Sequence, residues 1–333
     1  MRLPALFLLA SLAFAAVDGT VMNRTSGKPE ANATVTLYRL DQAGMQPVRT
    51  VRAAADGKFQ FDAKVEGPHL LQAIHRGVAY NHMLSPGSPS TGIELAVFDS
   101  SSKPGIAPVA QHMVLLEPAE GRLAVSETFF LRNQSNLTYN NSEQGTLRIF
   151  LPEEAVESAR VMATAPNSMP VERPSQKTNT PGIYLIDFPI KPGETRIDLT
   201  YQLPFSGTGK FAGRVLEKEG TARLVVPSGV TIQGEGLEML GIEPSTQAQI
   251  YGLKTGPYAV EITGTGALRA TDRGEDEAPG IQQILPRIYD RLYWVLGLSL
   301  AILGIGFYLL YRSPNKEVQA SAPPPARTGR KAK

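Results

Sequence analysis

The feature that most constrains the fold is a two-residue alternation of apolar and polar side chains, which recurs along most of the chain. In "GIYLIDFPI" the apolar positions are Tyr184, Ile186, Phe188 and Ile190. In "TRIDLTYQLPF" they are Ile197, Leu199, Tyr201 and Leu203, and the residues between them are Arg196, Asp198, Thr200 and Gln202. Because successive side chains of a strand point to opposite faces, this pattern predicts strands with one buried and one wet face. The turn sequence "KPGE" between the two segments predicts that they form a hairpin.

Turn-forming residues support an all-β chain. Glycine (31) and proline (26) make up about a sixth of the 333 residues, which favours many turns between short strands. Further alternating segments predict a second β-sandwich region over residues 108–266, formed as one unit or two. Residues 100–107 contain Pro104 and Gly105 and predict a linker, and residues 152–163 predict a short helix.

The first 100 residues carry an ordered set of strand and turn signals. The set begins with Gly19 and Val21, continues through Gly27, Pro29, Ala33, Val35 and Leu37, and ends with Asp56, Gly57, Phe59, Phe61, Gly67, Gly77, Val78 and Tyr80. This order resembles the carboxypeptidase regulatory-like domain, and the resemblance implies a transthyretin-like β-sandwich over residues 16–99. Domains of that family are usually non-catalytic modules, so the resemblance implies binding and no activity of its own. The chain as a whole is similar to bacterial envelope proteins that join such modules to an anchor.

Both ends of the chain predict export and membrane attachment. Residues 1–15 fit a cleaved signal peptide, with Arg2 before an apolar run and Ala13 and Ala15 at the cleavage site. Near the other end, residues 293–311 hold no charge and would span about 28 Å as a helix, close to the thickness of a bilayer core. We therefore expect one transmembrane helix over residues 292–311, preceded by a polar stalk at 267–291.

Flanking charge predicts the orientation of this helix. Six basic residues follow it and three precede it, so the positive-inside rule places the tail, residues 312–333, in the cytoplasm. The tail has no large apolar residue except Val318 and is expected to be disordered. The body would then lie on the periplasmic side of the inner membrane. Gly297, Ala301 and Gly304 share a face of the helix and can support a weak homodimer, although glycine is also common in single spans.

The sequence contains no recognisable catalytic or cofactor-binding motif. There is no cysteine, which excludes disulfides, thiolate catalysis and cysteine-bound metals, and the net charge of +2 gives no indication of nucleic-acid binding. His75 and His82 flank the turn at Gly77, with His69 nearby, and could converge on a metal ion. Histidines at such positions are, however, more often surface or cross-strand residues. None of these histidines, nor His112, belongs to a zinc-peptidase motif. We therefore predict no catalytic, cofactor or metal site.

From the predicted architecture and the lack of a catalytic motif we expect one of two functions, which belong to different classes. The first is a non-enzymatic, membrane-anchored adapter or scaffold that binds another envelope protein through its β domains. The alternative is a surface protein that binds cell-wall or extracellular polysaccharide. Tyr80, Tyr139 and Tyr201 are the candidates for stacking on sugar, since Trp294, the one tryptophan, belongs to the predicted membrane helix. A hydrolase with an unrecognisable site is a third and weaker expectation.

Overall fold

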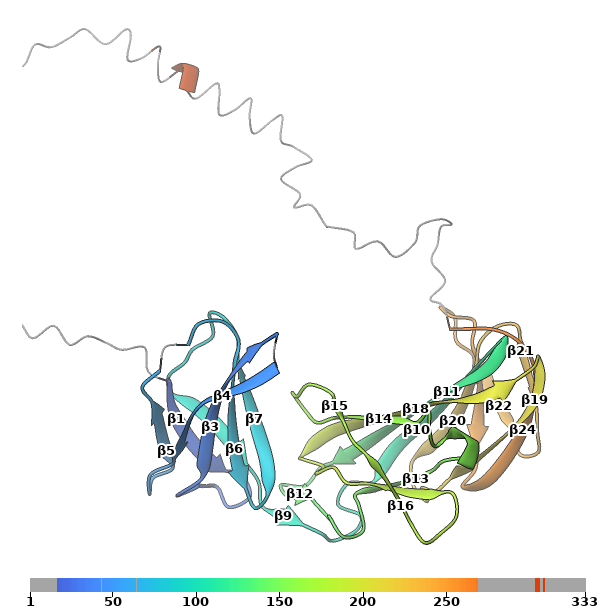
Figure 1. Ribbon diagram of the computed structural model, residues 1–333, viewed down its shortest axis with the longest axis horizontal. Helices are drawn as coiled ribbons and strands as arrows, with labels where there is room; N and C mark the ends of the chain where they lie inside the picture. Colours follow the sequence, from blue (N-terminus) through green and yellow to red (C-terminus); the bar gives the residue numbers. More distant parts are fainter. Residues whose placement is uncertain (1–16, 43, 64, 269–302, 306–307, 309–333) are drawn as a thin grey trace, which may run out of the picture. The chain divides into compact units, whose positions relative to one another are not determined.

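The computed structural model describes residues 17–42, 44–63, 65–268, 303–305 and 308. The described part is mostly β, with several antiparallel sheets and one short 3₁₀ helix, η1 (Glu153–Ala155), which confirms the all-β prediction (Figure 1). Residues 17–268 belong to one compact unit. Residues 303–305 and 308 belong to a second unit and are helical.

The first hydrophobic core lies between two four-stranded sheets. One sheet contains β1 (Val17–Asn23), β2 (Lys28–Pro29), β5 (Lys58–Phe61) and β8 (Ile93–Val97). The other has the order β4 (Gly44–Arg52), β3 (Thr34–Asp41), β6 (His69–His75) and β7 (Val78–Leu84). Alternate side chains of both sheets pack into a common core, which includes Phe61, Leu37 and Leu71, all almost fully buried. The arrangement is a β-sandwich.

Gly19 is the most crowded glycine of this first core. It lies in the middle of the sheet, where β1 pairs antiparallel with β5 and parallel with β8. A Cβ atom at this position would lie 2.1 Å from the carbonyl oxygen of Ile93 and 2.8 Å from the ring of Phe59. Only glycine therefore lets the two neighbouring strands approach β1 this closely.

Replacing Gly19 with alanine is expected to lower the free energy of unfolding by about 2–3 kcal/mol, because the methyl group collides with backbone that cannot rotate away. Gly252→Ala is the matched control. It also lies within a strand, and its Cβ would meet nothing closer than 3.7 Å, so we expect little change or a small gain. Urea unfolding followed by circular dichroism compares the two variants. Equal stabilities would contradict the steric account.

The second hydrophobic core is formed by residues 107–262. Its main sheet has eight strands in the order β15 (Val171–Glu172), β14 (Arg160–Thr164), β18 (Gly193–Phe205), β11 (Gly121–Asn133), β10 (Val109–Ala119), β20 (Thr221–Val226), β23 (Gln249–Leu253) and β22 (Glu238–Ile242). Two three-stranded sheets contribute to the same core. They contain β13 (Leu147–Phe150), β17 (Ile183–Ile186) and β16 (Ser175–Lys177), and β19 (Thr208–Val215), β24 (Gly256–Gly264) and β21 (Val230–Gln233).

The predicted hairpin between residues 182 and 205 is wrong, because its two segments belong to different sheets. The first segment forms β17, which pairs with β13 and β16. The second forms β18, which pairs with β11 and β14. Between the two strands, Phe188 and Ile190 are buried in the core, and Ile190 bridges to Tyr139. The segment therefore carries the chain from one sheet to the other.

The buried faces predicted for the same two segments are confirmed, apart from Leu203, which is only partly buried. The buried positions are Tyr184, Ile186, Phe188, Ile190, Ile197, Leu199 and Tyr201. Alternation thus determines which face of a strand is buried, but not which strand is its partner.

Two smaller expectations also need correction. The helix predicted over residues 152–163 is limited to η1, and Arg160 already begins β14, on which Val161 and Ala163 are buried. The segment predicted as a linker is partly ordered, because β9 (Ser100–Ser101) pairs in parallel with β12 (Thr138–Tyr139).

Several expectations concern residues outside the described part. These are the signal peptide at 1–15, the tail at 312–333, most of the stalk at 267–291 and most of the membrane helix at 292–311, including Gly297 and Ala301. Among the residues that are described, no helix has the length and apolarity needed to cross a membrane.

Candidate functional site

His75 and His82 do not converge on a common site. In the antiparallel pairing of β6 with β7, His75 lies opposite Val78 and His82 lies opposite Leu71. Their positions are thus four residues apart along the ladder, about 13 Å at 3.3 Å per residue. Across the described ranges, no group of three or more histidine and acidic side chains is arranged to hold a metal ion.

His75 instead lies in a polar cluster with two carboxylates. Its Nε2 is 2.9 Å from Asp99 Oδ1 and its Nδ1 is 3.3 Å from Glu30 Oε1. The Asn23 side-chain amide donates to both carboxylates, at 3.0 Å to Glu30 and 3.1 Å to Asp99. The hydrogen bond from His75 is the main cause of the lowered pKa of Asp99. Both ring nitrogens of His75 are therefore engaged in contacts within the fold.

This cluster adjoins the connection between the two cores. The backbone N–H of Thr138 donates to the Asp99 carbonyl at 2.8 Å. The Tyr80 hydroxyl donates to the Phe98 carbonyl and lies 2.8 Å from Thr138 Oγ1. Lys191 Nζ lies 5.1 Å from the centre of the Tyr80 ring, and burial lowers the pKa of Lys191 to about 8. The connection is thus held by hydrogen bonds on both sides.

The three tyrosines considered for sugar stacking do not form a platform. Tyr80 and Tyr201 are each only 3% exposed, and both use their hydroxyl groups in buried hydrogen bonds. Tyr139 is half-buried and belongs to the short strand β12. The expectation that these rings are available to a polysaccharide is therefore wrong for Tyr80 and Tyr201, because both rings fill the interior.

A charged cluster is buried in the second core. His112 of β10 is 3% exposed and stacks on Phe129, with the ring centres 4.1 Å apart. Its Nε2 lies 2.9 Å from Glu127 Oε2, and its Nδ1 lies 3.3 Å from Glu217 Oε2. The Tyr201 hydroxyl donates to the other oxygen of Glu127 at 2.8 Å. The imidazole is thus held between two carboxylates inside the second core, where unpaired charge is costly.

The two carboxylates determine the charge of this histidine. Burial alone would lower the pKa of His112, but its contacts with Glu127 and Glu217 outweigh burial and raise the pKa to about 9. An adjoining cavity of about 30 Å³, lined in part by Glu217, Thr221 and Thr255, is large enough for about one water molecule. No serine or threonine hydroxyl of the described part hydrogen-bonds to His112. The cluster therefore has the form of a buried ion cluster and not of a nucleophile paired with a base.

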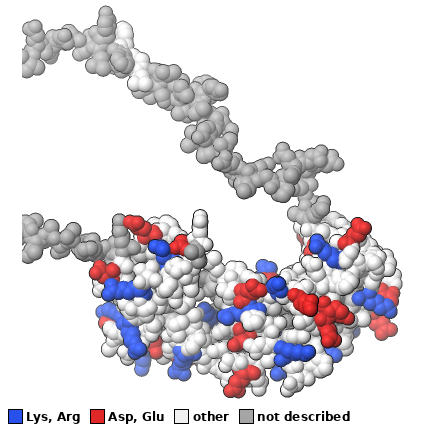
Figure 2. All heavy atoms as spheres, viewed as in Figure 1, with Lys and Arg blue, Asp and Glu red and all other residues white. Residues whose placement is uncertain are grey.

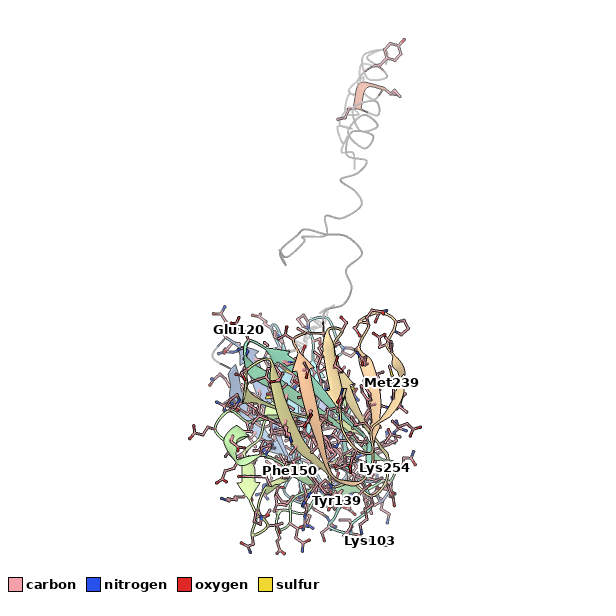
Figure 3. The ribbon with its side chains drawn as sticks, turned by 90° about the vertical axis from the view of Figure 1, so that its right-hand side faces the viewer. Lys103, Glu120, Tyr139, Phe150, Met239 and Lys254 are labelled. Carbon is pink, nitrogen blue, oxygen red and sulfur yellow. The ribbon has the colours of Figure 1, made fainter. Side chains whose placement is uncertain are left out.

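The edge strand β22 exposes several large apolar side chains. It ends the eight-stranded sheet and pairs only with β23. Met239, Leu240 and Ile242 are 54%, 51% and 53% exposed. Met239 lies at the margin of the ribbon in Figure 3. An edge strand that exposes both backbone groups and large apolar side chains is suited to accept another strand.

A second exposed edge strand, β4, ends a sheet of the first core. Nearly all of its nine residues are exposed, including Met45 (46%) and Val48 (48%). Arg49 and Arg52 make this strand basic, whereas β22 begins with an acidic residue and is directly followed by another. Elsewhere on the face drawn in Figure 2, side chains of both signs are interspersed.

Comparison with known proteins gives only distant structural likeness. The sequence matches no protein-family model and no curated protein. Matched solved structures include an M1 zinc metallopeptidase from Deinococcus radiodurans, with 12% identity, a TM-score of 0.27 and coverage of 49% of this chain and 43% of that chain. Yeast LTA4 hydrolase matches with 9% identity, a TM-score of 0.30 and coverage of 47% and 29%. The matched part is thus less than half of either structure.

Proposed function

We propose that this protein is a non-enzymatic adapter of the bacterial cell envelope, anchored in the cytoplasmic membrane, which binds another envelope component at the edge strand β22. The observation that carries the proposal is the exposure of three large apolar side chains on one edge strand. An edge strand with exposed apolar side chains and unpaired backbone groups is a template for pairing with another chain.

The predicted architecture is consistent with this role. The resemblance of residues 16–99 to the carboxypeptidase regulatory-like domain implies a transthyretin-like binding module. The predicted signal peptide and membrane helix would hold the β body outside the cytoplasmic membrane. The hydrogen bonds around Asp99 and Thr138 would keep the connection between the two cores ordered.

Cross-linking from β22 tests the proposal. A photo-activated amino acid replaces Leu240 in the full-length protein, and the cells are irradiated before the membranes are solubilised. We expect a specific protein adduct from this position and none from Glu120, an exposed turn residue placed away from β22 (Figure 3). The adduct should disappear in a Met239→Asp, Ile242→Asp variant, whose folding stability should change by only about 0.5 kcal/mol because both side chains are exposed.

The same experiment can contradict the proposal. Equal labelling from Leu240 and Glu120, or no adduct from either, would show that β22 has no specific partner. An adduct that carries polysaccharide and no protein would favour the alternative function.

A further inference from the structure

Resting on the proposed role of β22, we infer that the strand added to β22 is β4 of a second copy of this chain, so that copies join head to tail. The two strands are the exposed edges of different sheets. Each carries large apolar side chains about half exposed, Met45 and Val48 on β4 and Met239, Leu240 and Ile242 on β22. Each strand therefore offers an exposed sheet edge and exposed apolar side chains, which are the features that strand addition uses.

Charge favours this unlike pair over either like pair. β4 contains Arg49 and Arg52 and no acidic residue, and the stretch from Glu235 to Glu243 contains no basic residue. Glu243 keeps its charge, because hydrogen bonds from the side chains and backbone of Thr246 and Ser245 lower its pKa to about 2. Two β22 strands would bring acids together and two β4 strands would bring arginines together, whereas β4 against β22 pairs opposite charges.

An antiparallel arrangement satisfies these charge contacts together. With Arg52 beside Glu238, Arg49 lies toward the Glu243 end of β22. Both arginines therefore lie near an acidic residue in the same arrangement.

The same arrangement brings apolar side chains together over a short ladder. Val48 then lies near Ile242. The pairing of β4 with β3 shifts register at Val48, and the pairing of β22 with β23 shifts register at Leu240. Pro47 of β4 also lacks a backbone N–H. The ladder between copies is therefore expected to involve only a few residues, and the association to be reversible.

The contact joins different surfaces of the two copies. Such a heterologous contact leaves one free β4 and one free β22 after each addition, so it produces rings or open chains and not a closed symmetric dimer. The protein would then be a scaffold that assembles on itself.

Single-cysteine cross-linking tests the inference in the native membrane, since the chain has no cysteine of its own. Full-length Val48→Cys and Ile242→Cys variants are expressed separately and together, with oxidant added to the membranes. We expect a dimeric adduct only when both variants are present, and a ladder of higher adducts from a chain that carries both substitutions. An adduct from Ile242→Cys alone, or no adduct in any combination, would overturn the inference.

A charge exchange provides the matched control. Arg49→Glu with Arg52→Glu should reduce the adduct by about tenfold or more. Partner copies with Glu238→Arg should restore part of it. If Leu240 cross-links to a different protein while the cysteine pairs give no adduct, the adapter proposal stands and the self-assembly inference fails. If both experiments give nothing, both fail.

Discussion

Replacing His112 with alanine is expected to lower the free energy of unfolding by about 3–5 kcal/mol, or to prevent folding. The substitution leaves Glu127 and Glu217 buried without their shared cation and removes the ring that stacks on Phe129. Urea unfolding of the full-length protein, followed by circular dichroism, measures the loss.

His82→Ala is the matched control, because His82 is exposed and should cost no more than about 0.5 kcal/mol. A double-mutant cycle of His112→Ala with Glu127→Ala should give a coupling energy of about 1–3 kcal/mol. A decrease of less than about 1 kcal/mol in the free energy of unfolding of His112→Ala would contradict the placement of a charged histidine in this core.

The same histidine should make stability depend on pH. The folded-state pKa of His112 is about 9, above the ordinary value of 6.5, so folding favours the protonated form. The resulting stability is fully present below about pH 6.5 and is lost as the pH rises through 9, a change of about 3 kcal/mol. Urea unfolding at several pH values between about 6 and 9.5 measures the change.

The comparison with His112→Gln isolates this contribution. Lys191, whose pKa is lowered to about 8, makes stability rise with pH above that value, but this effect is the same in both proteins. The difference in stability between wild type and His112→Gln should therefore shrink as the pH rises. A difference that stays constant over the whole pH range would contradict the ion cluster.

The sequence predicts burial on individual strands well and strand partners poorly. On β18, alternation correctly places Ile197, Leu199 and Tyr201 in the core. It cannot show that β18 forms a thirteen-residue ladder with β11, because the pairing depends on contacts distant in the sequence.

The buried ion cluster left a signal in the sequence. Along β11 the inward positions include Leu123, Val125, Glu127, Phe129 and Leu131, so a glutamate interrupts an apolar face. Such an interruption predicts a buried charge with a partner. The partner itself could not be predicted, because Glu217 follows β19 and is brought to His112 only by the fold.

The edge strands could be predicted less well. "GLEMLGIE" has the length and apolar content of a strand, but nothing in it distinguishes an edge position from a central one. The exposure of Met239, Leu240 and Ile242 follows from the position of β22 at the end of the sheet order.

Amide hydrogen exchange at β22 tests most directly whether another strand adds to this edge. The full-length protein is labelled in extracts of its native cells beside the Met239→Asp, Ile242→Asp variant, and exchange is followed in a peptide that contains residues 238–242. We expect slow exchange in the native protein and fast exchange in the variant, because strand addition engages the edge amides. Equally fast exchange in both proteins would contradict it.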